Sequence, residues 1–257
     1  LETGGISALS GAQPRPLRSD TGVYDTEELG RAIMPPGVQR ARTRLICLEN
    51  TFHLDRGLAV EKSRYADTVD IARRHGLPVF MDGARIFNAA LATNTTVGDL
   101  TGFCDAVDVC LCKGLAAPLG SMLMGSRDFI DEARRIRQRI GGGMRQAGVI
   151  AAPGILALTK MVERLPEDHE NAETMRRGLE AKGIAVDRGG VLTNIVNLDV
   201  SPAGWKAPLF AEKLLGLGIR AKVCTDRTLR MVLHNDIGAR EVSVVLDRVG
   251  EVLRGRA

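Results

Sequence analysis

Short apolar runs alternate with helical stretches in the first half of the chain, and this alternation most constrains the fold. Thr43–Leu48 is typical of a strand, Arg64–His75 of a helix, and Pro78–Met81 of a second strand. Strand, helix and strand in this order form a β-α-β unit, in which the two strands lie parallel. We therefore expect an α/β fold with a mostly parallel sheet and flanking helices.

The alternation continues beyond the first unit. Val107–Cys112 is a further strand candidate, and Gly120–Gly125 a short return strand. Arg127–Ile140 is expected to be helical, and Met144–Arg164 to form a long helix with a kink at Pro153 and Gly154.

Pro166 marks the expected domain boundary, which divides the chain into a large domain, 1–165, and a smaller C-terminal α+β domain, 166–257. The smaller domain is expected to contain three helices and three strand regions. The helices are Glu167–Lys182, Pro208–Leu215 and Arg240–Arg254, and the strand regions are Ile184–Val200, Ile219–Cys224 and Thr228–Leu233.

Charged residues follow two of the apolar runs directly. Lys113 ends one run, and Asp82 with Arg85 ends the run before it. The carboxyl ends of strands in an open α/β sheet face the ligand crevice, so an amine, a carboxylate and a guanidinium would converge there. That trio suits pyridoxal phosphate, which needs a lysine for its Schiff base and a carboxylate for its pyridine nitrogen. A solvated lysine cap and a routine Asp-Gly turn are the alternatives.

Three longer segments carry a specific family resemblance. They are Phe80–Ala89, Val109–Ser121 and Gly141–Gly148, and further similarity lies in Leu48–Thr51 and Leu229–Asp236. In this order they resemble the signature segments of the low-specificity L-threonine aldolases, over nearly the whole chain. The resemblance implies the fold-type-I pyridoxal phosphate architecture of aspartate aminotransferase, with cofactor binding in the large domain. It also implies retro-aldol cleavage of threonine, allo-threonine and related β-hydroxy-α-amino acids to glycine and an aldehyde.

The resemblance also implies a role for each matching residue. Lys113 would bind the cofactor covalently, Asp82 would pair with the pyridine nitrogen, and Arg145 would reach the cofactor phosphate across a dimer interface. Arg85 and Arg230 would hold the substrate carboxylate, since a guanidinium forms two parallel hydrogen bonds to a carboxylate. On its own, Arg230 would be taken for an outward-facing strand residue.

The base that acts on the substrate hydroxyl stays open. The family often has a histidine directly after Glu-Asn-Thr, where this chain has Phe52, with His53 one residue later. We therefore assign His53 as the catalytic candidate. His75 is expected at a helix end and His169 on the surface.

Composition limits the classes of partner. The 257 residues are 44% hydrophobic and 26% charged, and a net charge of +4 is spread along the sequence. These values describe a globular protein and favour neither nucleic acid nor a membrane as partner. The five cysteines fit reduced thiols in a cytoplasmic protein. Cys110 and Cys112 are expected in the core rather than in a zinc site, and no metal site is expected.

The first residues resemble sequence from inside the family's large domain. We therefore expect that an N-terminal segment carrying the family's phosphate-binding Ser-Gly-Thr loop precedes Leu1, and that its loss would impair activity. The expected assembly is a homodimer or homotetramer with a shared active site. Another pyridoxal phosphate lyase and a non-catalytic fragment or partner subunit of this fold are the alternative functions.

Overall fold

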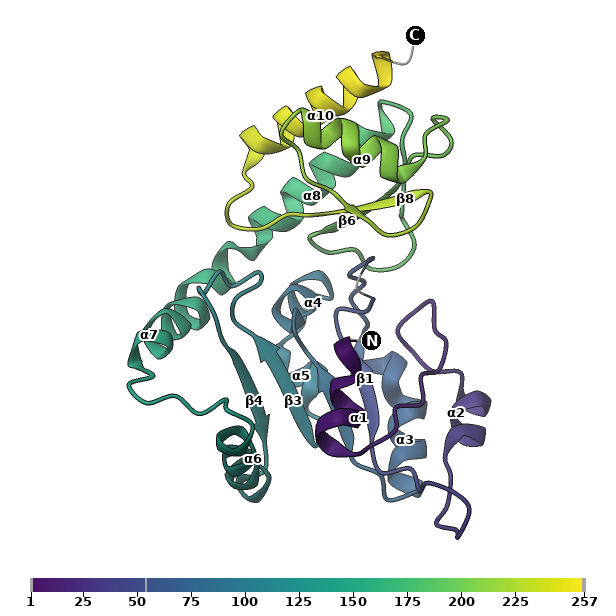
Figure 1. The fold of residues 1–257 in the computed structure, drawn as a ribbon, viewed down its shortest axis with the longest axis vertical. Helices are drawn as coiled ribbons and strands as arrows, with labels where there is room; N and C mark the ends of the chain where they lie inside the picture. Colours follow the sequence, from purple (N-terminus) through teal and green to yellow (C-terminus); the bar gives the residue numbers. More distant parts are fainter. Residues whose placement is uncertain (1, 54, 256–257) are drawn as a thin grey trace.

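Two four-stranded sheets form the framework of the chain, and each has its own hydrophobic core. The structure is a computed structural model that describes residues 2–53 and 55–255. Figure 1 shows the long helix α8 (Leu165–Glu180) running between the two sheets. None of the helices in these described ranges is long and apolar enough to cross a membrane.

The first sheet has the strand order β1-β2-β3-β4. The strands β1 (Ile46–Glu49), β2 (Val79–Asp82) and β3 (Ala106–Cys110) are parallel, and β4 (Ser121–Gly125) returns antiparallel to β3. The predicted parallel sheet and its return strand are therefore confirmed. Its apolar face packs on a core that contains Tyr65, Met81, Ile86 and Leu100, all fully buried.

Helices connect and flank these strands. The predicted helix at 64–75 is confirmed as a 3₁₀ turn, η2 (Lys62–Tyr65), followed by α3 (Ala66–Arg74). The predicted helix at 127–140 is confirmed as α6 (Arg127–Arg139), which the Ser126 side chain caps. The other elements of this half are η1 (Glu2–Gly4), α1 (Gly5–Ser10), α2 (Thr26–Ala32), α4 (Ile86–Ala92) and α5 (Val97–Thr101).

The predicted long helix at 144–164 is wrong in its start and its continuity. The helix α7 (Gly148–Leu156) begins four residues later than predicted, after the glycine-rich turn. A π-helical segment, η3 (Ala157–Met161), and a 3₁₀ turn, η4 (Val162–Arg164), then lead into α8. The α-helix runs through Pro153 and Gly154, and the π-helical segment begins only after them, at Ala157, so the predicted kink at these two residues is not where the regular helix ends.

The second sheet is antiparallel throughout, with the order β5-β6-β8-β7. Its strands are β5 (Ala185–Val186), β6 (Ile195–Asp199), β7 (Lys222–Val223) and β8 (Thr228–Val232), and α9 (Ala207–Gly216) and α10 (Ala239–Arg254) pack with α8 around its core. This matches the α+β organisation predicted after Pro166. The boundary between residues 165 and 166 falls in the first turn of α8 and stays a prediction.

Candidate active site

Three carboxyl side chains lie in a row where the parallel strands end. Glu49 is in register with Asp82, and Asp82 is in register with Asp108. Because residues in register point to the same face of a sheet, these three side chains share one face. Of the three, sequence reasoning assigned a role only to Asp82.

The turn after Asp82 is fixed by short backbone contacts. The Asp82 carboxylate accepts a hydrogen bond from the Ala84 backbone N–H at 2.9 Å, and the Gly83 N–H donates to the Asp108 carbonyl at 2.8 Å. A Cβ atom at Gly83 would lie 2.8 Å from that same carbonyl oxygen, so a larger residue would push the two strands apart. The exposed Asp82 carboxylate is therefore held at a defined place.

Lys113 lies three residues beyond the end of β3, in a tight turn, and its side chain is exposed. The Lys113 carbonyl accepts from the Ala116 N–H at 3.0 Å, and the Leu111 N–H donates to the Gly120 carbonyl at 3.0 Å. A Cβ atom at Gly114 would lie 3.0 Å from the Asn88 amide oxygen, so glycine lets this turn pack closely on α4. Lys113 is thus a flexible amine on a firmly held backbone.

The pKa values of the two neighbouring carboxyls show that Lys113 and Asp82 share one electrostatic environment. The pKa of Glu49 is raised to about 7, mainly by burial and next by the Asp82 charge, while the Arg85 and Lys113 charges act to lower it. Burial and then the Asp82 charge also raise the pKa of Asp108, and Lys113 opposes this. The amine and carboxylate predicted from the strand ends are therefore brought together.

Two arginines from different parts of the chain carry charges that interact near this group. Arg85 precedes the first turn of α4, and Arg230 lies on β8 of the second sheet. Both are half-buried. Burial lowers the pKa of Arg85, and the Arg230 charge lowers it further. An anion such as a carboxylate placed between two like charges would remove their repulsion.

His53 and Arg145 both lie in exposed segments outside the helices and strands. His53 is exposed on the loop after β1, where its ring stacks edge-on to Phe52 and its Nδ1 accepts from the Asp55 N–H at 3.2 Å. Arg145 is exposed in the segment between α6 and α7. Their assigned roles stay predictions.

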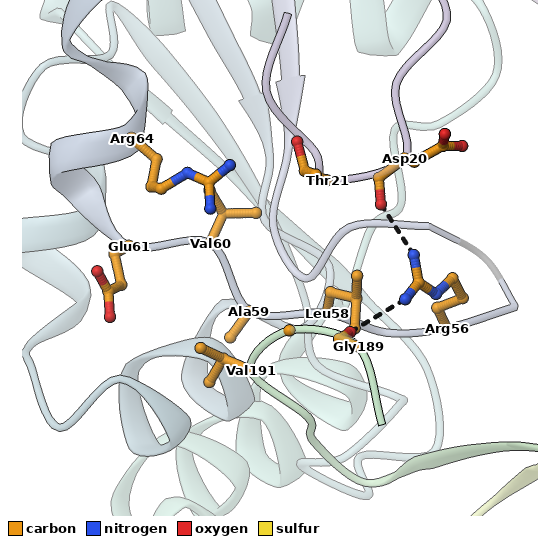
Figure 2. Close-up of a pocket in the computed structure, with 11 residues that line it drawn as sticks. Asp20, Thr21, Arg56, Leu58, Ala59, Val60, Glu61, Arg64, Gly189 and Val191 are labelled. Carbon is orange, nitrogen blue, oxygen red and sulfur yellow. Dashed lines mark hydrogen bonds between the residues drawn. The ribbon is translucent and has the colours of Figure 1, made fainter. Parts of the chain in front are cut away.

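Arg56 ties the His53 loop to the second half of the chain. Its guanidinium donates to the Asp187 carboxylate through two nitrogens, and to the backbone carbonyls of Asp20 and Gly189 at 2.8 and 3.0 Å. Figure 2 shows Arg56 between these two backbone segments, at the wall of a surface pocket. The candidate catalytic residues do not line this pocket, so we assign the chemistry to the strand ends instead.

Two predictions about individual side chains are wrong. His169 is half-buried rather than a surface residue; its Nε2 lies 3.1 Å from the Asn88 amide nitrogen, and burial lowers its pKa to about 4. Cys110 is half-buried and Cys112 is exposed, so this pair is not in the core. The strand ends at Cys110, and the turn that follows carries Cys112 outward.

No group of three or more metal-ligating side chains occurs within residues 2–53 and 55–255. The side chains at the strand ends instead fit pyridoxal phosphate. They include an exposed amine, a carboxylate held by a backbone N–H, and two guanidinium groups whose charges interact.

Comparisons with known proteins identify the family. A family model described as beta-eliminating lyase matches residues 1–201. The low-specificity L-threonine aldolase 1 of Arabidopsis thaliana is 38% identical over 254 residues, which cover 95% of this chain and 70% of the relative. The low specificity L-threonine aldolase of Escherichia coli O157:H7 is 36% identical over 95% of this chain and 71% of its own length.

A solved structure shows the same fold. The Leishmania major threonine aldolase superposes with a TM-score of 0.80 over 98% of this chain and 73% of that chain, at 19% identity. The fold and the strand-end site define a lyase of the pyridoxal phosphate fold-type-I class. Within that class, the chain belongs to the low-specificity L-threonine aldolase family.

Proposed function

We propose that this chain cleaves L-threonine, L-allo-threonine and related β-hydroxy-α-amino acids to glycine and an aldehyde, with pyridoxal 5′-phosphate as cofactor. The convergence of Lys113, Asp82, Arg85 and Arg230 at the carboxyl edge of the first sheet carries this proposal. Membership of the threonine aldolase family supports it.

Lys113 and Asp82 would hold the cofactor. The Lys113 amine, exposed and flexible beyond β3, would bind it covalently and release it to the amino group of the substrate. The Asp82 carboxylate would keep a proton on the pyridine nitrogen, because an adjacent negative charge stabilises the protonated ring. When bound, pyridoxal phosphate supplies an electron-withdrawing ring that accepts the electron pair from the substrate α-carbon.

Arg85 and Arg230 would bind the substrate α-carboxylate. Arg85 comes from the turn before α4 and Arg230 from β8, so a carboxylate held by both would be fixed in direction as well as in position. This orientation determines which bond of the α-carbon is aligned for cleavage. The same carboxylate would also compensate the two like charges.

The bond that breaks joins the α- and β-carbons of the substrate. The β-hydroxyl must lose its proton as the aldehyde forms, and the α-carbon must gain a proton to give glycine. We assign the first transfer to His53, which lies on the loop directly after β1.

Arg145 would bind the cofactor phosphate of a second subunit, which requires a homodimer or a homotetramer. Its exposed place between α6 and α7 leaves its guanidinium accessible to another chain. We further propose that residues 1–165 form the cofactor-binding domain and that the protein acts in the cytoplasm.

Product analysis after loading with pyridoxal phosphate tests the reaction type. We expect glycine and acetaldehyde in equal amounts from threonine. A β-eliminating lyase would instead release ammonia and 2-oxobutanoate. A chain that takes up the cofactor on Lys113 but forms neither set of products would be a non-catalytic member of the fold.

A further inference from the structure

Two cysteine thiols touch each other directly before Lys113. The Sγ atoms of Cys110 and Cys112 are 3.4 Å apart. Residues two apart in an extended strand are separated by about 6.6 Å along the backbone, so their side chains are usually well apart. Here β3 ends at Cys110, and the turn that follows brings the two sulfurs into contact.

The backbone of this turn is held at its centre. Leu111 is buried; its N–H donates to the Gly120 carbonyl at 3.0 Å, and its carbonyl accepts from the Ala117 N–H at 2.9 Å. Cys110 is the last residue of β3 and is paired with Ser121 of β4. Cys112 is exposed and is therefore the thiol that can move and that a reagent in solution can reach.

A metal does not explain this pair. Thiolate metal sites need three or four ligands, and the described part of the chain offers no third histidine, cysteine or carboxylate beside these two sulfurs. Burial raises the pKa of the Cys110 thiol, and the hydrogen bond with Cys112 adds to this. Cys110 is thus the less reactive thiol of the two and is suited to the second step of an exchange.

We propose that Cys110 and Cys112 form a reversible redox site that closes a disulfide when the chain meets a low-molecular-weight disulfide such as oxidised glutathione. The Cys112 thiolate attacks one glutathione sulfur, forms a mixed disulfide and releases the first glutathione thiol. The Cys110 sulfur then attacks Cys112 and releases the second. Two protein thiols lose two protons and two electrons, and one glutathione disulfide becomes two thiols.

Closing this bond displaces the residue beside Lys113. A disulfide is about 2.05 Å long, so the sulfurs must approach by more than about 1 Å from their present 3.4 Å. Because both the N–H and the carbonyl of Leu111 are hydrogen-bonded, the movement falls on Cys112, the residue directly before Lys113. If Lys113 binds the cofactor as proposed above, the oxidised chain should attach pyridoxal phosphate poorly.

Thiol titration and peptide mass spectrometry test the bond itself. Trypsin cuts after Arg85 and Lys113, so one peptide, 86–113, contains Cys104, Cys110 and Cys112. After the chain is treated with oxidised glutathione, we expect the mass of this peptide to fall by two hydrogen atoms. Reduction with dithiothreitol should restore the original mass. Cys104→Ser is the matched control and should still form the bond. Cys110→Ser should stop at a glutathione adduct on Cys112.

Three results for the wild-type peptide would overturn the proposed redox site. The peptide stays reduced, it keeps a bound glutathione, or it forms its disulfide through Cys104. Cofactor attachment is measured separately, by borohydride reduction and absorbance. Turnover should fall on the order of a hundredfold on oxidation, because misplacing a catalytic group by about 1 Å has a cost of this size. Cys112→Ser should keep both its cofactor attachment and its turnover in the presence of oxidised glutathione. If the bond forms but no form of the chain cleaves threonine, the proposed function fails and the redox site stands.

Discussion

Glu49 should make the stability of this chain fall as the pH rises through neutrality. This carboxyl is half-buried at the end of β1, directly beside the Asp82 charge, and its pKa is raised from 4.5 to about 7. The folded chain therefore holds the Glu49 proton more tightly than the unfolded chain does. The stabilisation is fully present below about pH 4.5 and is lost as the pH rises through about 7.

The size of this loss follows from the two pKa values. At about 1.4 kcal/mol for each pKa unit, the difference between 4.5 and about 7 corresponds to at most about 3.5 kcal/mol. Glu49 is still partly reached by water, which screens the charges around it, so we expect about 1–2 kcal/mol. Asp108 acts in the same direction, since its pKa is also raised. His169 acts in the opposite direction below about pH 6.5, because its pKa is lowered to about 4.

Urea unfolding of wild type and Glu49→Gln at intervals from pH 5 to pH 8.5 isolates the Glu49 contribution. The difference in free energy of unfolding between the two proteins should change by about 1–2 kcal/mol over this pH range. The variant should gain stability relative to the wild type at high pH. Glu212→Gln, on the exposed side of α9, is the matched control and should leave the pH profile unchanged. A Glu49→Gln profile parallel to that of the wild type would refute the raised pKa.

Four further outcomes test the site and its framework. Lys113→Ala should abolish covalent cofactor attachment, seen as loss of visible absorbance, and lower turnover more than about a hundredfold. Asp82→Asn should retain the cofactor but lose about a hundredfold in kcat, or about 2.7 kcal/mol, in a threonine assay. Arg230→Lys should raise KM about tenfold or more with a smaller change in kcat, because a point charge replaces a bidentate grip. Arg56→Ala should lower the unfolding free energy by about 1–3 kcal/mol in urea, since it leaves the half-buried Asp187 without its partner.

Sequence reasoning located the strands of the first sheet because their signals are local. Each strand is a short apolar run, and each run ends in a turn signal such as Asp82-Gly83. The short helices α1, α2, α4 and α5 were not predicted, because each is seven residues or fewer and gives little periodic pattern.

The error about His169 has a different cause, which is packing between distant segments. His169 follows Asp168 in a charged helical stretch, and nothing in that sequence shows that α4 will cover its ring with Asn88. Glu49 was noticed only as part of a family segment. Its raised pKa depends on burial and on the neighbouring strand, neither of which the local sequence specifies.

The position of Arg230 depends on contacts that join the two sheets. On the second sheet, Arg230 is in register with Asn197 on one side and with Lys222 on the other. The Asn197 amide donates to the Asp55 carbonyl at 3.4 Å, and the Lys222 amine lies 3.6 Å from the Asp55 carboxylate. The two neighbours of Arg230 in the sheet therefore both contact Asp55, on the loop that follows β1. This position lets the Arg230 charge act on Arg85. A strand pattern alone leaves this arginine facing outward, so the proposed substrate site is a property of both sheets and of the loop between them.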